Sequence, residues 1–175
     1  MIDVLKKLFL IYILTCSYFQ TYAADRIYTA ISDDSNIENY VSTSTGCAIY
    51  SVCFSVIKAC NENISIKEIA KEFEEFGNPP YSILDIVSVL ERHSLLGKGY
   101  RLKNPDMIFS HNFIYGILYL RNLGKEIGHY SFCFRGKDGT LWVADPRFSN
   151  KCLKFTPESK LLKLFTGILI EIKKI

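Results

Sequence analysis

Residues 46–59 read GCAIYSVCFSVIKA, a glycine and a cysteine followed by a mostly apolar run. A run of this length and composition predicts a buried helix over 48–59, which Thr45 can cap. Gly46 allows a tight turn just before it, so Cys47 is expected at the helix N-terminus. Helix starts favour negative charge, because their N–H groups are unpaired and the helix dipole is positive there. This is one of the two conditions for an activated thiol.

Two further helices are predicted by the residues at their starts. Ser65 and Glu68 form a capping box for a helix over 65–76. The same pattern, a serine followed three residues later by an acidic residue, opens a helix over 82–95. Gly97 is expected to end that helix.

After Gly97 the chain changes to short runs rich in aromatic and β-branched residues. Such runs predict strands over 114–120, 129–135, 140–144 and 167–172. A tight-turn signal, KDG at 137–139, joins two of them into a hairpin. Helices first and strands second predict an α+β domain, with an N-terminal helical half packed on a C-terminal antiparallel sheet.

Two polar residues lie at the ends of the strands that this hairpin joins. His129 follows Gly128 at the start of one strand, and Asp145 ends the next. The hairpin brings both residues to the end away from its turn, where the carboxylate can orient the imidazole. Taken singly, Cys47 also fits a core position and Asp145 the start of an ordinary turn. Together, Cys47, His129 and Asp145 form a predicted catalytic triad for thiol hydrolysis.

These stretches together resemble the bacteriocin-processing cysteine peptidases, also called double-glycine peptidases. The segments that match the family in order and spacing are CAIYSV at 47–52, ERHSLLG at 91–97, GHY at 128–130, VADP at 143–146 and FTG at 165–167. It extends over roughly residues 40–172. The resemblance implies a papain-like fold, the triad above, and cleavage of peptides after a Gly-Gly pair, usually while leader peptides are removed during export.

Two positions depart from the family's pattern. The family usually has a glutamine about six residues before the cysteine, whose amide helps to form the oxyanion hole, and Val41 stands there. Ala48 replaces the glycine that usually follows the cysteine. The backbone N–H of the cysteine remains, and the hydroxyl groups that can donate beside it are those of Ser42, Thr43 and Ser44.

Two alternatives to a full peptidase stay open. Loss of one oxyanion donor costs about 10²–10³ in rate, so one alternative is a catalytically impaired papain-like domain that binds peptides. The other is a different papain-like acyl-transfer enzyme, such as a transglutaminase or an amide hydrolase, because the same triad serves those reactions.

The first residues have the pattern of a signal peptide. Lys6 and Lys7 supply positive charge, LFLIYILTC at 8–16 is apolar, and Thr21 and Ala23 stand at the −3 and −1 positions of a cleavage site. The apolar run is shorter than the about 20 residues that a bilayer span needs; a core helix or a short anchor are the alternatives. We expect a signal peptide over 1–23, a mature domain over 24–175, and a periplasmic or secreted protein without a stable membrane span.

The transporter-linked members of the resembled family carry membrane spans and an ATPase on the same chain. This sequence has neither, and it has no Gly-x-x-x-x-Gly-Lys phosphate loop. A stand-alone exported member is therefore expected.

The six cysteines bear on redox state and metal binding. Cys16 would leave with the signal peptide, and the odd number that remains predicts at least one free thiol. Apart from Cys47, the remaining cysteines allow either two disulfides or buried thiols, and they are Cys53, Cys60, Cys133 and Cys152. With no Cys-x-x-Cys and only three histidines, neither a structural zinc site nor another cofactor is expected.

Composition and charge restrict the classes of partner. The chain is 49% apolar and 14% aromatic, so most of it should fold as one domain. Its net charge is +3, and its densest basic pairs stand at opposite ends of the chain, at 6–7 and 173–174. A nucleic-acid partner is not expected without a basic cluster. A peptide or leader-peptide substrate is the expected partner.

Overall fold

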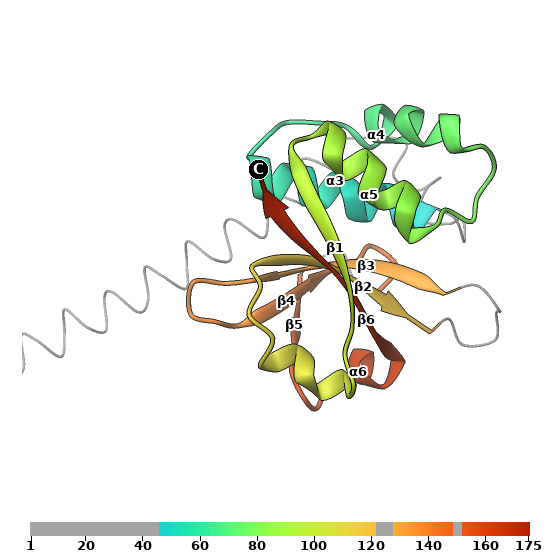
Figure 1. Cartoon of the computed structure of the whole chain (residues 1–175). Helices are drawn as coiled ribbons and strands as arrows, with labels where there is room; N and C mark the ends of the chain where they lie inside the picture. The colour runs from blue at the N-terminus through green and yellow to red at the C-terminus, as the bar shows by residue number, and fades with distance from the viewer. Residues whose placement is uncertain (1–45, 122–127, 149–151) are drawn as a thin grey trace, which may run out of the picture.

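Three helices from the first half of the described chain lie together on one side of a sheet (Figure 1). The structure is a computed structural model, and it describes residues 46–121, 128–148 and 152–175. The helices are α3 (Gly46–Cys60), α4 (Ile66–Phe73) and α5 (Ile83–Arg92). All the strands follow them in the sequence, so the predicted α+β class is confirmed.

Both predicted capping boxes are present at the starts of α4 and α5. The Ser65 hydroxyl accepts from the Glu68 N–H at 3.2 Å, and the Glu68 carboxylate accepts from the Ser65 N–H at 2.8 Å. Ser82 and Asp85 make the same two bonds at 3.2 Å and 2.6 Å. Each box satisfies N–H groups that a helix start leaves unpaired. A 3₁₀ turn, η1 (Glu74–Phe76), continues α4 to its predicted end.

The predicted end of α5 is wrong. The helix stops at Arg92, because Ser94 adopts a left-handed conformation (φ 55°) and the chain enters β1 (Leu95–Arg101) at once. Gly97, which was expected to end the helix, lies inside this strand and pairs with the last strand of the chain. That partner is remote in sequence, so no local pattern contains it.

The six-stranded sheet is antiparallel throughout, with the order β1-β6-β2-β3-β4-β5. The strands after β1 are β2 (Tyr115–Leu120), β3 (His129–Arg135), β4 (Leu141–Ala144), β5 (Leu153–Phe155) and β6 (Phe165–Lys174). The prediction missed β1, which contains two glycines, and β5, which has 3 residues. Two short elements fill the connections, η2 (Pro105–Phe109) and α6 (Lys160–Leu164).

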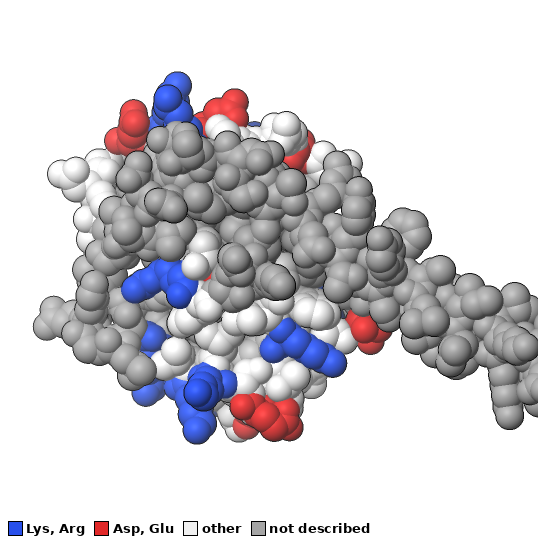
Figure 2. Space-filling view, turned by 180° about the vertical axis from the view of Figure 1, so that it is seen from behind, with Lys and Arg blue, Asp and Glu red and all other residues white. Residues whose placement is uncertain are grey.

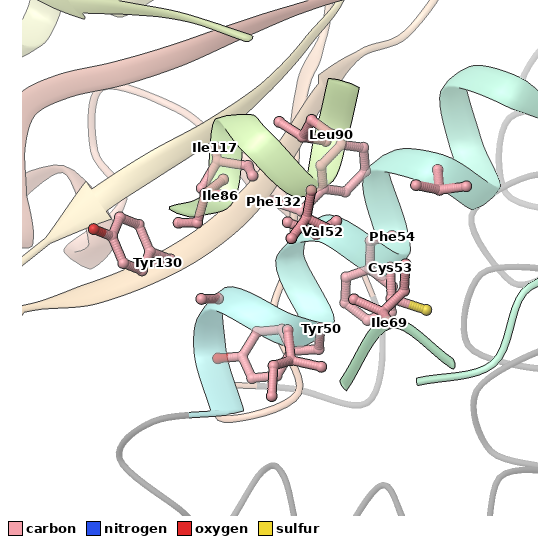
Figure 3. Packing of buried hydrophobic residues seen from close by; sticks show 14 of the residues in the cluster. Tyr50, Val52, Cys53, Phe54, Ile69, Ile86, Leu90, Ile117, Tyr130 and Phe132 are labelled. Atoms are coloured by element: carbon pink, nitrogen blue, oxygen red, sulfur yellow. The ribbon is translucent and has the colours of Figure 1, made fainter. Parts of the chain in front are cut away.

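Apolar side chains pack on both faces of the sheet. On the helical face, the Phe54 ring of α3 and the Phe132 ring of β3 are fully buried, with centroids 6.3 Å apart. Figure 3 shows side chains of α3, α5 and the sheet meeting in this core. Cys133 belongs to the core on the other face, as the two-residue period of a strand requires. The helix that carries Cys47 is thereby fixed against β3.

The described surface has a mixed charge distribution on the face shown in Figure 2, where Lys and Arg side chains stand apart among uncharged residues. Within the described ranges, no helix combines the length and hydropathy that crossing a bilayer requires. The predicted signal segment, residues 1–23, lies outside the described residues.

Candidate active site

Cys47 is the second residue of α3 and lies at its N-terminal end, which is buried. Residues 46–56 of this helix are all buried, and Cys47 itself is 5% exposed. The first-turn N–H groups of a helix have no intrahelical acceptor. This end of α3 can therefore stabilise a thiolate, or an oxyanion formed beside it.

His129 opens β3 and Asp145 directly follows β4, and their side chains meet. Nε2 of His129 lies 2.6 Å from Oδ2 of Asp145. Phe132 of β3 pairs with Ala144 of β4, so the start of β3 and the end of β4 lie side by side at the same end of the sheet. The histidine is 2% exposed and the aspartate 1%, so solvent screens their interaction weakly.

The thiol of Cys47 also contacts His129, so the structure brings the three predicted residues together. Burial lowers the pKa of His129, but hydrogen bonds to Asp145 and to Cys47, with the negative charges of both, raise it overall to about 9. An imidazolium next to a cysteine at a helix start is the arrangement that activates a thiol near neutral pH.

Tyr50 is a site residue that the sequence prediction missed. Its hydroxyl donates to Oδ1 of Asp145 at 3.2 Å and lies 3.1 Å from Nε2 of His129. Burial, followed by the negative charges of Asp145 and Cys47, raises the pKa of this tyrosine well above its ordinary value. The phenol therefore stays neutral and acts as a donor. The signal for it was its place in α3, three residues after Cys47 and so on the same helix face.

Two further donors hold the Asp145 carboxylate. The Ser131 hydroxyl donates to Oδ2, and the Arg147 backbone N–H donates to Oδ1 at 3.0 Å. Ser131 lies two residues after His129 in β3 and therefore on the same face of the strand. With His129 and Tyr50, these groups give a buried anion a full set of hydrogen bonds, as such a group requires.

The turn after Asp145 covers the imidazole with two exposed residues. Nη1 of Arg147 lies 3.0 Å from Nδ1 of His129. The Phe148 ring stands edge-on to the imidazole, with centroids 5.7 Å apart and planes at 88°. A guanidinium carries only donors, so this contact is a hydrogen bond only when Nδ1 is unprotonated.

The predicted oxyanion donors lie outside the described residues. They are Ser42, Thr43 and Ser44, which precede the start of α3, as does Val41. Of the groups that the sequence analysis named as oxyanion donors, the backbone N–H of Cys47 lies within the described residues. No group of three or more His, Cys, Asp or Glu side chains within 46–121, 128–148 and 152–175 could hold a metal ion.

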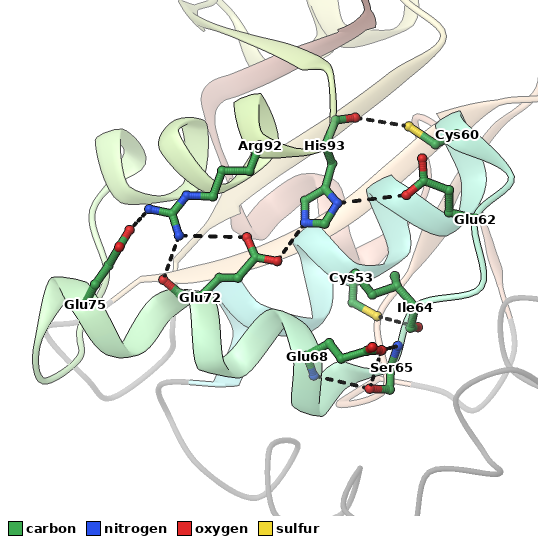
Figure 4. Close-up of polar contacts among 10 residues, drawn as sticks. All are labelled: Cys53, Cys60, Glu62, Ile64, Ser65, Glu68, Glu72, Glu75, Arg92 and His93. Carbon is green, nitrogen blue, oxygen red and sulfur yellow. Dashed lines mark hydrogen bonds and ion pairs between the residues drawn. The ribbon is translucent and has the colours of Figure 1, made fainter.

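A second polar cluster lies at the opposite end of α3 (Figure 4). His93 caps α5, and its Nε2 lies 2.9 Å from a carboxylate oxygen of Glu72. Arg92 pairs with Glu72 and Glu75, which ties α5 to α4 and η1. The Cys60 thiol donates to the His93 carbonyl at 3.4 Å. These contacts join α3, α4 and α5, and Cys60 gives the far end of α3 a thiol that can be compared with Cys47.

The His129 contacts predict how stability depends on pH. Because the pKa of the folded-state imidazole is about 9 and its ordinary value is 6.5, its stabilising contribution is complete below pH 6.5 and is lost as the pH rises through about 9. The free energy of unfolding in urea of wild type, minus that of His129→Gln, should decrease as the pH rises from 6.5 to about 9. A difference that stays constant across this window would contradict the pKa assignment.

Comparisons with known proteins show what this chain is similar to. No protein-family model matches it, and no curated protein matches it in sequence. The peptidase domain of Streptococcus ComA, a bi-functional ABC transporter involved in a quorum sensing pathway, has a TM-score of 0.58 at 19% identity, covering 76% of this chain and 94% of that one. A double glycine motif protease from an AMS/PCAT transporter, solved with the leader peptide, has a TM-score of 0.56 at 18% identity, covering 77% of this chain and 88% of that one. The likeness shows the fold: three helices on an antiparallel sheet, as in these papain-like double-glycine peptidase domains, which confirms the predicted fold class.

Proposed function

We propose that the chain is a cysteine peptidase whose triad is Cys47, His129 and Asp145. The observation that carries this proposal is the position of His129, which contacts the Cys47 thiol and lies 2.6 Å from Asp145. The fold supports the same proposal, because the solved structures that resemble it are peptidase domains. The proposal rests on the fold and the His129 contacts together.

In the proposed reaction each residue has one task. His129 accepts the thiol proton, and the Cys47 sulfur attacks the peptide carbonyl. The Cys47 backbone N–H, with a hydroxyl from the segment 42–44, stabilises the oxyanion. The imidazolium then protonates the leaving amine, and water releases the acyl group from sulfur while Asp145 holds the ring. No cofactor takes part.

The proposed substrate is a peptide, cleaved after a Gly-Gly pair. The resemblance at the triad segments supports this choice, and one structural neighbour was solved with a leader peptide bound. Glycine on the acyl side suits a cysteine that is only 5% exposed, because a residue without a side chain approaches closely.

Turnover of a Gly-Gly peptide tests the proposal. Wild type should cleave it after the second glycine, and Cys47→Ala should abolish cleavage because the nucleophile is gone. Asp145→Asn should lower kcat by about 10²–10⁴-fold, since it removes the charge that supports the imidazolium. Product masses from liquid chromatography locate the cut.

Cys60→Ala is the matched control for Cys47→Ala. It removes a thiol from the other end of α3, beside His93, and should leave turnover unchanged. Cleavage that survives in Cys47→Ala would refute the triad. Transfer of glutamine amides to amines, with no cut in Gly-Gly peptides, would point to the transglutaminase alternative.

Val41 allows the impaired-enzyme alternative to be tested. If this residue stands where the family has its oxyanion glutamine, Val41→Gln should restore a donor and raise kcat by up to about 10²–10³-fold. The comparison is made with the same peptide and with thermal unfolding as a check on folding. No turnover by wild type and no gain in the variant, over a broad panel of peptides, would favour a non-catalytic peptide-binding domain.

We also propose that the protein is exported, with residues 1–23 removed as a signal peptide. The proposal rests on the charge and hydropathy of that segment. Mass spectrometry of the protein recovered from its producing cells should show a chain that begins at Ala24. Recovery of an intact chain from the cytoplasm would contradict the proposal.

A further inference from the structure

The turn after Asp145 holds a guanidinium against the proposed general base. Nη1 of Arg147 lies 3.0 Å from Nδ1 of His129, while the Arg147 backbone N–H donates to Asp145. The second bond anchors the main chain of this residue at the site. The Arg147 side chain as a whole is nevertheless exposed, so a ligand can reach the rest of its donors.

Arg147 makes an unusual contact for a cation. A guanidinium hydrogen-bonds most strongly with carboxylates, which it can bind through two parallel bonds. Among the ion pairs of the described residues, none joins Arg147 to a carboxylate, and its guanidinium instead contacts Nδ1 of His129. A carboxylate brought to this site would therefore be a stronger partner than Nδ1 of His129.

The chemistry of Nδ1 indicates which part of a substrate lies beside Arg147. Since Nε2 of His129 faces Asp145, Nδ1 is the nitrogen left to exchange protons with Cys47 and with the leaving amine. A group in contact with Nδ1 therefore borders the leaving side of the scissile bond. Phe148, which follows Arg147, is 44% exposed and stands edge-on to the same imidazole.

We propose that Arg147 is a specificity-determining residue, selecting peptides with an acidic side chain immediately after the scissile bond. This inference rests on the proposed peptidase function. The substrate carboxylate draws Arg147 away from Nδ1 of His129 and leaves that nitrogen to Cys47. An acidic substrate thus occupies the guanidinium and frees Nδ1 for proton exchange.

A pair of small alkylating reagents tests carboxylate recognition without any turnover. Iodoacetate and iodoacetamide react with the Cys47 thiolate in the same way, by displacement of iodide, and differ in carrying a carboxylate or an amide. The ratio of the iodoacetate rate constant to the iodoacetamide rate constant does not depend on the intrinsic reactivity of the thiol. Relative to wild type, Arg147→Gln should lower the iodoacetate-to-iodoacetamide ratio by at least about threefold, and Arg147→Lys should lower it less.

Arg101→Gln is the matched control for net charge. Arg101 ends β1, which β6 and β2 separate from β3, so its loss changes the total charge but not the site. The iodoacetate-to-iodoacetamide ratio of Arg101→Gln should equal that of wild type. A ratio in Arg147→Gln that equals the wild-type value, or an equal fall in Arg101→Gln, would overturn the inference.

Two peptides that differ by one group extend the test to the reaction. A substrate with Gly-Gly followed by Glu should have a kcat/KM at least about threefold above its Gly-Gly-Gln counterpart, and Arg147→Gln should remove that preference. Equal cleavage of the two by wild type would overturn the inference and leave the proposed function standing. Cleavage of neither would refute the proposed function, while the alkylation ratio would still decide whether Arg147 recognises a carboxylate.

Discussion

The site depends on one buried carboxylate, that of Asp145. A carboxylate that is 1% exposed has lost its hydration, and it is tolerated only if protein donors replace the water. Its donors are the His129 ring, the Tyr50 and Ser131 hydroxyls and the Arg147 backbone N–H. They come from α3, β3 and the turn after β4. The charge that orients the imidazole therefore also joins the helical half to the sheet.

Tyr50 makes this junction specific to the cysteine. It lies three residues after Cys47 on α3, so the two side chains share a helix face. Because its hydroxyl touches both His129 and Asp145, any slide or rotation of α3 that displaced the thiol would also break these hydrogen bonds. Thiol catalysis needs its groups held to within a fraction of an ångström. The tyrosine thus couples the position of the nucleophile to that of its base.

Local sequence rules predicted the parts of the site that local structure creates. The glycine before Cys47, the strand opening at His129 and the strand end at Asp145 are each written in a few adjacent residues. Tyr50 was not predicted, because a tyrosine in an apolar helix has a polar role only once β3 packs across it. Arg147 was missed since its partner nitrogen is defined by the folded turn. The insertion of β6 between β1 and β2 joins distant segments, which no short-range pattern encodes.

The central claim is that His129 activates Cys47, and the pH dependence of alkylation by iodoacetamide measures this most directly. In wild type, Cys47 should react readily at about pH 6, where ordinary thiols are almost unreactive, while Cys60 at the other end of α3 should react only at higher pH because burial and Glu62 raise its pKa. His129→Ala should abolish the reaction of Cys47 at the lower pH without changing that of Cys60. Equal reactivity of the two thiols at about pH 6, or a Cys47 rate that His129→Ala leaves unchanged, would contradict the account.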